Sequence, residues 1–261
     1  MQTASNRQLT LLRKLNRKKY RYKERLFLIE GARAVRQVVA NNLVPIEALF
    51  FDKSQGYASE RSWKELAAHT TAALLEETDF AAISDTDSPQ GVLAMCRMPD
   101  EQPVEKMSAR RGVIVALDAL QDPGNVGTII RTASWFGAVG LLAGKGTVDL
   151  FHPKVVRSTA GATGTVPHCN GRLPDLLGEF EDEGWRPILL NKSEQSVALS
   201  SVQPSDKTIL VVGNEGHGIH SSLLSDDRLQ AEITSPGSGK EPVESLNAAI
   251  ATSIALYHLT I

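Results

Sequence analysis

The chain has 261 residues, of which 42% are hydrophobic and 22% charged, with 20 glycines and 12 prolines. This composition is that of a folded soluble protein, and it excludes collagen-like and disordered classes. The length allows one large domain or two smaller ones. The longest apolar candidate, LNAAIATSIALYHLTI, is shorter than the roughly 18 to 20 residues of a bilayer span, so a buried C-terminal helix and no membrane partner are expected.

Neither the start of the chain nor its cysteines indicate export. The first residues lack the apolar stretch of a signal peptide, so the protein is expected to stay in the cytoplasm. Cys96 and Cys169 lie 73 positions apart, without a CxxC pair or a Cys/His cluster. We therefore expect buried thiols, with neither a disulfide framework nor a metal site.

The formal net charge of -2 hides an uneven distribution. Residues 1–25 contain nine basic side chains and one acid, Glu24, so this segment carries about +8 and the rest of the chain about -10. Basic side chains with Tyr20 and Tyr22 between them can neutralise phosphates and stack on bases, which predicts a basic arm that binds nucleic acid. On charge pattern alone, a solvated or frayed terminus is the alternative.

Apolar runs and helix-periodic segments alternate through residues 1–98, which is typical of an α/β fold. The expected strands are FLIEG, PIEALFFDK, TAALLEE and GVLAMCRM, and the expected helices are RAVRQVVANN, SERSWKELAAHT and TDFAAISD. Residues 99–110, PDEQPVEKMSAR, are polar, contain proline and show no periodicity, so we expect a linker there. This predicts a small N-terminal domain over residues 1–98 and a second domain over residues 111–261.

The second domain is also predicted to be α/β. It begins with VIVALDAL, a continuous apolar run that suits a strand covered on both faces. Further strands are expected at AVGLLAG, TVPHC, RPILLN, TILVVG and RLQAEIT. NVGTIIRTASWFG is expected to be a helix that ends at Gly137. Its apolar residues share one helical face: Val126, Ile129, Ile130, Ala133 and Phe136.

Three polar clusters in the second domain follow strands, where ligands bind in open α/β sheets. The first, QDPGNVGTIIR, places Asn125 and Arg131 around a helix start, which suits an anion or close approach of a ligand to the backbone. Its spacing matches neither GxGxxG nor a Walker motif. An Asn that only caps the helix and a helix-surface Arg are the structural alternative.

The second and third clusters are also rich in glycine. LVVGNEGHGI packs three glycines around Asn214, Glu215 and His217 after an apolar strand, and a tight turn explains the glycines but not the acid. In the third, Ser245 is the expected N-cap of the last helix, close to Asn247, and capping alone could explain it. Since no GxSxG elbow or catalytic carboxylate pair occurs, the residues predict a site made of three strand-end loops without naming its ligand.

Together and in this order, NVGTIIRTASWFGA, LVVGNEGHGI and VESLNAAIATSIAL resemble the three motifs of the SpoU family of RNA 2′-O-ribose methyltransferases, in the SPOUT class. HPKVVRSTAGATGTVP resembles the family segment between motifs one and two. KERLFLIEGARAVRQV and SPQGVLA are similar to the substrate-binding domain of its ribosomal-RNA members. The resemblance spans nearly the whole chain. It implies a small α/β RNA-binding domain followed by a parallel-sheet α/β methyltransferase domain with a deep trefoil knot.

The resemblance also implies the partners. The methyl donor would be S-adenosylmethionine, bound in the knot; the substrate would be ribosomal RNA; and the protein would be a homodimer with its active site near the subunit interface. A tRNA ribose 2′-O-methyltransferase is one alternative, and a non-catalytic RNA-binding or ribosome-assembly protein is another. A phosphate-cleaving enzyme is disfavoured because the sequence has no P-loop lysine and no acidic metal cluster.

Motif positions in the family imply the site residues. The implied catalytic residues are Asn125, Arg131, Glu215, Ser245 and Asn247. The implied cofactor-binding residues are Gly213, Asn214, Gly218, Ile233, Ser235 and Leu246. Because a guanidinium stays protonated in proteins, it is a poor base. We therefore expect Arg131 to bind the phosphate beside the ribose and stabilise developing alkoxide, with Glu215 holding Arg131 or the motif loop. The loop TSPGSGKEP is longer than in the family and lacks its usual Met, so contacts of Ser235 and Pro236 follow less directly.

Overall fold

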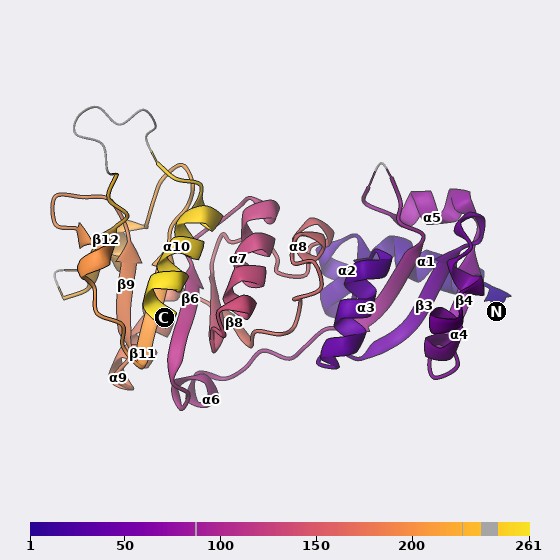
Figure 1. Cartoon of the computed structure of the whole chain (residues 1–261), viewed down its shortest axis with the longest axis horizontal. Coiled ribbons are helices and arrows are strands. Elements are labelled where there is room, and N and C mark those ends of the chain that lie inside the picture. Colours follow the sequence, from indigo (N-terminus) through magenta and orange to yellow (C-terminus); the bar gives the residue numbers. More distant parts are fainter. Residues whose placement is uncertain (87, 226, 236–244) are drawn as a thin grey trace. The chain divides into compact units, whose positions relative to one another are not determined.

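The computed structural model describes residues 1–86, 88–225, 227–235 and 245–261, and over these residues the chain forms two compact units (Figure 1). The first unit comprises Met1–Asp100 and Asp149–Thr165, and the second comprises Glu101–Val148 and Val166–Ile261. The segment Asp149–Thr165 thus belongs to the first unit, although the chain on both sides of it belongs to the second. None of the helices in the described ranges is long and apolar enough to cross a bilayer.

The described part of the first unit contains a five-stranded mixed sheet in the order β1-β4-β3-β5-β2. Its strands are β1 (Gln2–Thr3), β2 (Leu26–Glu30), β3 (Ile46–Asp52), β4 (Thr71–Leu75) and β5 (Val92–Arg97). Its α-helices are α1 (Asn6–Leu15), α2 (Lys18–Glu24), α3 (Ala32–Asn41), α4 (Arg61–Ala67), α5 (Glu77–Ile83) and α8 (Pro153–Ser158). Its short 3-10 turns are η1 (Lys53–Gln55) and η2 (Tyr57–Ser59). Helices α1 and α5 cover one face of this sheet, and α3 and α4 cover the other (Figure 1).

The basic segment at the start of the chain is folded. Ser5 begins α1 with a capping box, in which its hydroxyl accepts from the backbone N–H of Gln8 and the Gln8 side chain accepts from the backbone N–H of Ser5. Leu12 and Leu15 are fully buried against the sheet. The expected basic arm is therefore a pair of packed helices, and the frayed-terminus alternative is wrong, because apolar positions between the charges form a buried stripe.

One of the nine basic side chains is buried. The Arg21 side chain is 1% exposed and forms an ion pair with Asp149, whose own side chain is 5% exposed. The same carboxylate accepts from the Tyr22 hydroxyl at 2.9 Å, and the Arg21 guanidinium also donates to the Leu15 carbonyl at 2.9 Å. Arg21 therefore anchors the segment Asp149–Thr165 on α2 and is not available to RNA.

Replacing Arg21 with methionine is expected to destabilise the first unit by about 3–5 kcal/mol, because the Asp149 carboxylate would stay buried without its cation. Denaturant unfolding of the full-length protein measures this loss. The double variant Arg21→Met, Asp149→Asn is expected to recover part of it, because the uncompensated charge is gone. As a control, Arg13→Met removes a half-exposed pair with Asp79 and should cost less than about 1 kcal/mol. Equal losses for Arg13→Met and Arg21→Met would contradict a special role for burial.

The second unit is built on a parallel sheet, as expected, and its described strands follow the order β10-β12-β9-β11-β6-β7-β8. The strands are β6 (Gly112–Leu117), β7 (Gly140–Gly144), β8 (His168–Gly171), β9 (Arg186–Leu190), β10 (Val197–Ala198), β11 (Lys207–Val212) and β12 (Leu229–Glu232). The α-helices are α6 (Val104–Ser108), α7 (Pro123–Trp135), α9 (Leu173–Asp182) and α10 (Ala248–Thr260). The 3-10 turns are η3 (Leu199–Ser201) and η4 (Ser221–Leu223).

Both faces of this sheet are covered, which explains the continuous apolar run of β6. Ile114 and Ala116 pack in the core beneath α9. On the other face, α10 packs on β6 and β11, and α7 lies beside α10 (Figure 1). The segment expected to be a linker contains α6, whose Met107 is fully buried against Gly140. A five-residue helix is too short to show periodicity, so the sequence did not reveal it.

Candidate active site

Four neighbouring strands end at the same edge of the parallel sheet. In the register of β12, β9, β11 and β6, Ala231 pairs with Leu190, Leu190 with Val212, and Val212 with Leu117. The loops that follow these strands therefore emerge together at the carboxyl edge, where open α/β sheets bind their ligands. All three sequence motifs supply such loops or the helices next to them.

Hydrogen bonds tie the loop after β6 to the loop after β11. The buried carboxylate of Asp118 accepts from the backbone N–H of His220 at 2.7 Å, and the Asn214 side-chain amide donates to the carbonyl of Ala119 at 2.8 Å. The loop after β11 closes on itself, because Asn214 and Gly218 exchange two backbone hydrogen bonds of 2.9 Å. These bonds give the glycine-rich loop a defined shape.

A chain of side-chain hydrogen bonds joins the three motifs. The Asn125 amide donates to the Glu215 carboxylate at 3.0 Å, and the Asn247 amide donates to the Asn125 side-chain oxygen at 2.9 Å. The Asn247 oxygen accepts from the backbone N–H groups of Ala249 and Ile250, so it caps α10. Three residues far apart in sequence are thus held next to one another.

The structure decides the capping residues of α7 and α10 and the partner of Glu215. Asp122 caps α7 by accepting from the backbone N–H of Asn125 at 2.7 Å, so the side chain of Asn125 does not cap the helix and is available for other partners. Asn247 caps α10 in place of the expected Ser245, which is exposed. Of the two partners expected for Glu215, Arg131 and a motif loop, the carboxylate bonds to Asn125 of the first motif and not to Arg131. The sequence could not rank Asp122 against Asn125, or Ser245 against Asn247, because Asp, Asn and Ser can each cap a helix.

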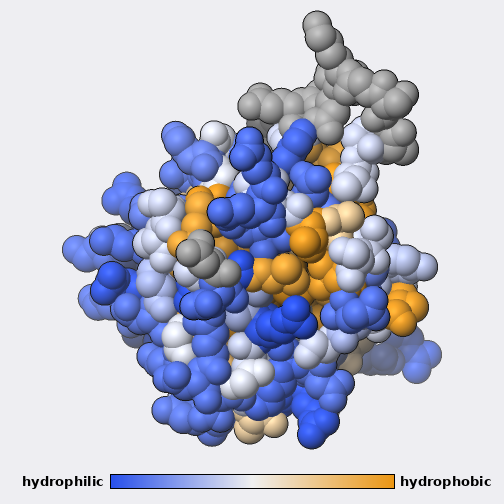
Figure 2. Space-filling view, turned by 90° about the vertical axis from the view of Figure 1, so that its left-hand side faces the viewer, coloured by the Kyte–Doolittle hydropathy of each residue, from blue (hydrophilic) through white to orange (hydrophobic). Residues whose placement is uncertain are grey.

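A cavity of about 1140 Å³ opens at this edge of the second unit. Figure 2 views the molecule from the side of β12 and shows hydrophobic surface gathered in the middle of this end, with hydrophilic residues around it. All six residues expected to bind the cofactor line the cavity: Gly213, Asn214, Gly218, Ile233, Ser235 and Leu246. Three of the residues expected to be catalytic also line it: Glu215, Ser245 and Asn247. Pro236 lies outside the described residues.

The cavity has one wall that the motifs did not indicate. Leu190, Asn191 and Lys192, at the end of β9, line it, as does Glu232 at the end of β12. Asn191 is positioned by its side-chain hydrogen bond to Gln230, at 2.7 Å. The signal was present in the sequence, because RPILLN is an apolar run that ends in polar residues. The sequence did not show that this strand, β9, lies between β11 and β12 in the sheet.

Arg131 stands apart from this network. It is exposed on α7, does not line the cavity, and forms no hydrogen bond or ion pair with any residue in the described ranges. Asn125 lies at the start of the same helix and does not line the cavity either, although it is bonded to two residues that do. Within one copy of the protein, Glu215, Asn125 and Asn247 are therefore held together. The Arg131 guanidinium is left accessible to a group outside the polypeptide.

The cysteines carry none of this chemistry. Cys96 is buried and Cys169 is half-buried, and both are free thiols. Burial raises the pKa of each thiol, so neither resembles an activated nucleophile. Among the described residues, no group of three His, Cys, Asp or Glu side chains is arranged to hold a metal ion.

Comparison with known proteins identifies the family. The SpoU rRNA Methylase family matches residues 112–257, and the MRM3-like substrate binding domain matches residues 6–94. The chain belongs to the SpoU family of methyltransferases. This assignment confirms the resemblance carried by the three motifs.

Relatives of this SpoU family member span its full length. It is 33% identical, over 99% of its length and 98% of the relative, to the 23S rRNA (guanosine(2553)-2'-O)-methyltransferase RlmP of Bacillus subtilis. A solved structure of an AdoMet-bound rRNA methyltransferase from Sinorhizobium meliloti is 28% identical, with a TM-score of 0.83 over 99% of this chain and 96% of that one. A TrmH-family protein from Porphyromonas gingivalis is 31% identical, with a TM-score of 0.81 over 98% of each chain.

Proposed function

We propose that this SpoU family member transfers a methyl group from S-adenosylmethionine to the 2′-hydroxyl of a ribose in ribosomal RNA, in the cytoplasm. The observation that carries the proposal is the hydrogen-bonded chain Glu215–Asn125–Asn247, which joins all three motifs beside one cavity. Its relative in Bacillus subtilis, similar over 98% of that protein's length, is named as a 23S rRNA 2′-O-methyltransferase.

The cavity suits a nucleoside-containing methyl donor. Its volume of about 1140 Å³ is above the roughly 300–1,000 Å³ of most small-ligand pockets. Gly213 and Gly218 expose backbone there, and Leu246 presents an apolar side chain that is 46% exposed. Backbone groups can recognise an adenine edge while the apolar side chain covers its face. When bound, S-adenosylmethionine supplies an electrophilic methyl group on a positively charged sulfur, and we expect no metal to be needed.

The residues of this chain have two tasks, to orient the ribose and to favour loss of its proton. Asn247 and Ser245 present an amide and a hydroxyl at the cavity. Asn125 positions Asn247 by accepting a hydrogen bond from its amide. In the proposed reaction these groups hold the ribose. The Arg131 guanidinium binds the neighbouring phosphate and stabilises negative charge on the 2′-oxygen, and a phosphate oxygen or water accepts the proton.

The homodimer is part of the same proposal. Apolar side chains are exposed on α7, on α10 and at the residue that follows α10, although the two helices pack against each other: Trp135, Ile250, Ile254, Tyr257 and Ile261. Trp135 is 84% exposed, and an apolar patch of this kind typically marks an interface. We infer that a second copy covers it. Arg131, four residues before Trp135, then lies at the interface and serves the active site formed there.

Placing charge in this patch is expected to separate the subunits. The double variant Trp135→Asp, Ile254→Asp should sediment as a monomer, because two carboxylates would be buried at the interface. The rate of methyl transfer should fall as the dimer is lost, while S-adenosylmethionine binding should remain measurable. Leu43→Asp, at an exposed apolar residue of the first unit, is the matched control and should change neither. A monomeric variant with full activity would contradict an active site at the interface.

A trefoil knot is the remaining structural part of the proposal. After β12 the described chain continues to residue 235, and it resumes at residue 245 and leads into α10. That helix packs on β6, β11 and α7 rather than beside β12. A chain that returns to the middle of the sheet at this point is consistent with passage of the C-terminal segment through a loop.

RNA contact is expected on the outer surface of α1 and α2. The exposed basic residues there are Arg7, Arg13, Lys14, Arg17, Lys18, Lys19 and Lys23. Tyr20 and Tyr22 lie beneath Lys14 and Lys18, at 5.5 and 5.4 Å from the ammonium to the ring centre. Deleting residues 1–25 would remove buried core along with these charges, so it would not isolate their effect.

Reversing three of these charges is expected to weaken RNA binding and its dependence on salt. In the variant Arg17→Glu, Lys19→Glu, Lys23→Glu, the slope of log affinity against log salt concentration should fall by about 0.7–0.9 for each phosphate that the protein no longer neutralises. Filter binding of a 23S rRNA transcript at several salt concentrations measures the slope. Arg111→Glu, on the second unit, should leave it unchanged. A triple variant with the wild-type slope would show that α2 does not touch phosphate.

Methyl transfer itself tests the proposed reaction. Purified protein, S-adenosylmethionine with a tritiated methyl group, and unmodified 23S rRNA transcript should give labelled RNA, and digestion to nucleosides should release a 2′-O-methylated nucleoside. A parallel reaction with unmodified tRNA distinguishes the alternative substrate. A labelled base instead of a labelled ribose, or labelling of tRNA alone, would contradict the proposal.

A further inference from the structure

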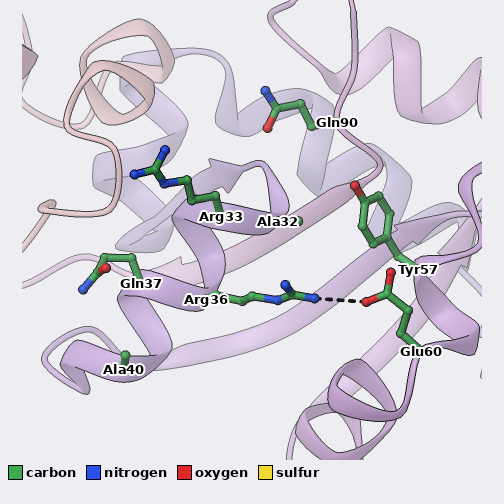
Figure 3. A pocket seen from close by; sticks show the side chains of 8 residues that line it. All are labelled: Ala32, Arg33, Arg36, Gln37, Ala40, Tyr57, Glu60 and Gln90. Atoms are coloured by element: carbon green, nitrogen blue, oxygen red, sulfur yellow. Dashed lines mark hydrogen bonds and ion pairs between the residues drawn. The ribbon is translucent and has the colours of Figure 1, made fainter.

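A second cavity, of about 690 Å³, lies in the first unit between α3 and the region of η2. Its lining residues are Ala32, Arg33, Arg36, Gln37, Ala40, Tyr57, Glu60 and Gln90. Figure 3 shows Tyr57 and Glu60 on one side of the cavity and Arg33 and Gln37 on the other. The small side chains of Ala32 and Ala40 leave the α3 side open. The three methyltransferase motifs contribute nothing to this cavity.

Two arginines one helical turn apart give the cavity its charge. Arg33 is exposed and has no ion pair or hydrogen bond with any residue in the described part of the chain. Arg36 donates to Glu60 at 3.0 Å and stacks on Trp63, with its guanidinium carbon 5.0 Å from the ring centre. Because a guanidinium has five N–H donors and the Arg36 side chain is 55% exposed, it keeps donors for a ligand. Because two guanidinium groups and only one carboxylate are among the described lining groups, the cavity favours binding of an anion.

The other residues that line the cavity favour binding of a nucleic-acid base. Tyr57 is half-buried, which restrains its ring, and it faces the cavity across from α3 (Figure 3). Gln90 supplies a side-chain amide, which can both donate and accept hydrogen bonds, whereas the Gln37 amide already donates to Asn41 at 2.9 Å. Cations for phosphate, an aromatic ring for stacking and an amide for a base edge are the combination by which proteins hold single-stranded nucleic acid.

We propose that this cavity binds one unpaired nucleotide of the RNA substrate. Arg33 and Arg36 hold its phosphate, Tyr57 stacks on its base, and the Gln90 amide contacts the base edge. The volume suits a single nucleotide rather than a duplex, and the aromatic wall would be unused by a free phosphate. The inference rests on the proposed function for the identity of the ligand. It adds a recognition site on the α3 face of the sheet, opposite α1.

Four variants separate the parts of this site in filter binding with an unmodified 23S rRNA transcript. Arg33→Ala should weaken binding severalfold and lower the salt slope by about 0.7, the value for one neutralised phosphate of a single strand. Tyr57→Leu should weaken binding about tenfold without changing the slope, and Tyr57→Phe should retain affinity. Glu60→Gln should tighten binding and steepen the slope, because it frees Arg36 from its acidic partner.

The matched control is Arg61→Ala. Arg61 is an exposed arginine on neighbouring α4 that pairs with Glu65 and does not line the cavity, so its loss should leave affinity and slope unchanged. Thermal unfolding checks that each variant is folded. Affinity for S-adenosylmethionine should stay at the wild-type value throughout, because that site is proposed in the second unit.

Failure of this inference is distinguishable from failure of the proposed reaction. If Arg33→Ala and Tyr57→Leu bind the transcript as the wild type does, with the same slope, the nucleotide site is overturned even when methyl transfer is normal. If the variants show the expected losses but the wild type methylates no ribose, the reaction is rejected and the RNA site stands. A gain in affinity with Glu60→Gln is the outcome that general destabilisation would not produce.

Discussion

Replacing Arg131 with lysine is expected to lower kcat for methyl transfer by about 100-fold or more, and Arg131→Ala is expected to lower it further. Lysine keeps the positive charge but loses the planar fork that can hold a phosphate and a developing alkoxide together. Because Arg131 does not line the cofactor cavity, affinity for S-adenosylmethionine should change by less than about twofold. Single-turnover methylation with saturating RNA and donor measures the effect on chemistry directly.

Arg111→Lys is the matched control for Arg131→Lys. Arg111 is an exposed arginine of the same unit, paired with Asp206, and its replacement should leave turnover unchanged. Undiminished turnover in Arg131→Lys would exclude a forked contact, and a parallel loss of S-adenosylmethionine affinity would place Arg131 in the cofactor site instead. Because Arg131 is exposed and bonded to no described residue, its replacement should not unfold the protein. A lower kcat in Arg131→Lys would therefore report on the reaction itself.

Gly213→Ala is expected to weaken S-adenosylmethionine binding by more than about 100-fold. A Cβ atom at Gly213 would lie 2.4 Å from the carbonyl carbon of Gly218 and 2.5 Å from the nitrogen of Ile219, so backbone would have to move. The paired hydrogen bonds between Asn214 and Gly218 would break, and the position of Glu215 would change with them. Calorimetric titration with S-adenosylmethionine measures the loss of affinity.

Gly216→Ala provides the comparison within the same loop. A Cβ atom at Gly216 would have the Asn214 side-chain oxygen as its nearest neighbour, at 3.6 Å, which is an ordinary contact. We expect affinity within about threefold of the wild type and an unchanged thermal midpoint. If Gly213→Ala bound the donor normally, the glycine-rich loop would not form the wall of the cofactor site. If both variants lost binding equally, loop flexibility rather than close backbone approach would be the cause.

Most of the regular structure was predictable because it depends on local patterns. Apolar runs marked β6, β9 and β11, and helical periodicity marked α7, whose predicted face is buried at Val126, Ile129 and Ala133. Helices α1 and α2 were not predicted, because nine basic side chains obscured the stripe formed by Leu12 and Leu15. Helix α6 was not predicted because five residues carry too little periodicity to register.

The residues of the candidate active site were also predicted only in part. Family motifs in the sequence were enough to single out Asn125, Glu215 and Asn247, but not the order in which they are bonded. Asn and Ser have similar preferences for the N-cap, so only the backbone geometry shows that Asn247 caps α10. The wall at Lys192 and Glu232 was not predicted, because local sequence does not say which strands are neighbours.

The amino-acid sequence by itself determined the α/β class, through short-range periodicity, and the family, through its motifs; the parallel sheet of the second unit was implied by the family resemblance. Tertiary structure alone decided that β12, β9, β11 and β6 are neighbours, that Asn125 lies between Glu215 and Asn247, and that Asp149 is buried on α2. The physical reason is that these side-chain contacts join residues 90 to 128 positions apart, where burial and register choose among many polar partners of equal local propensity.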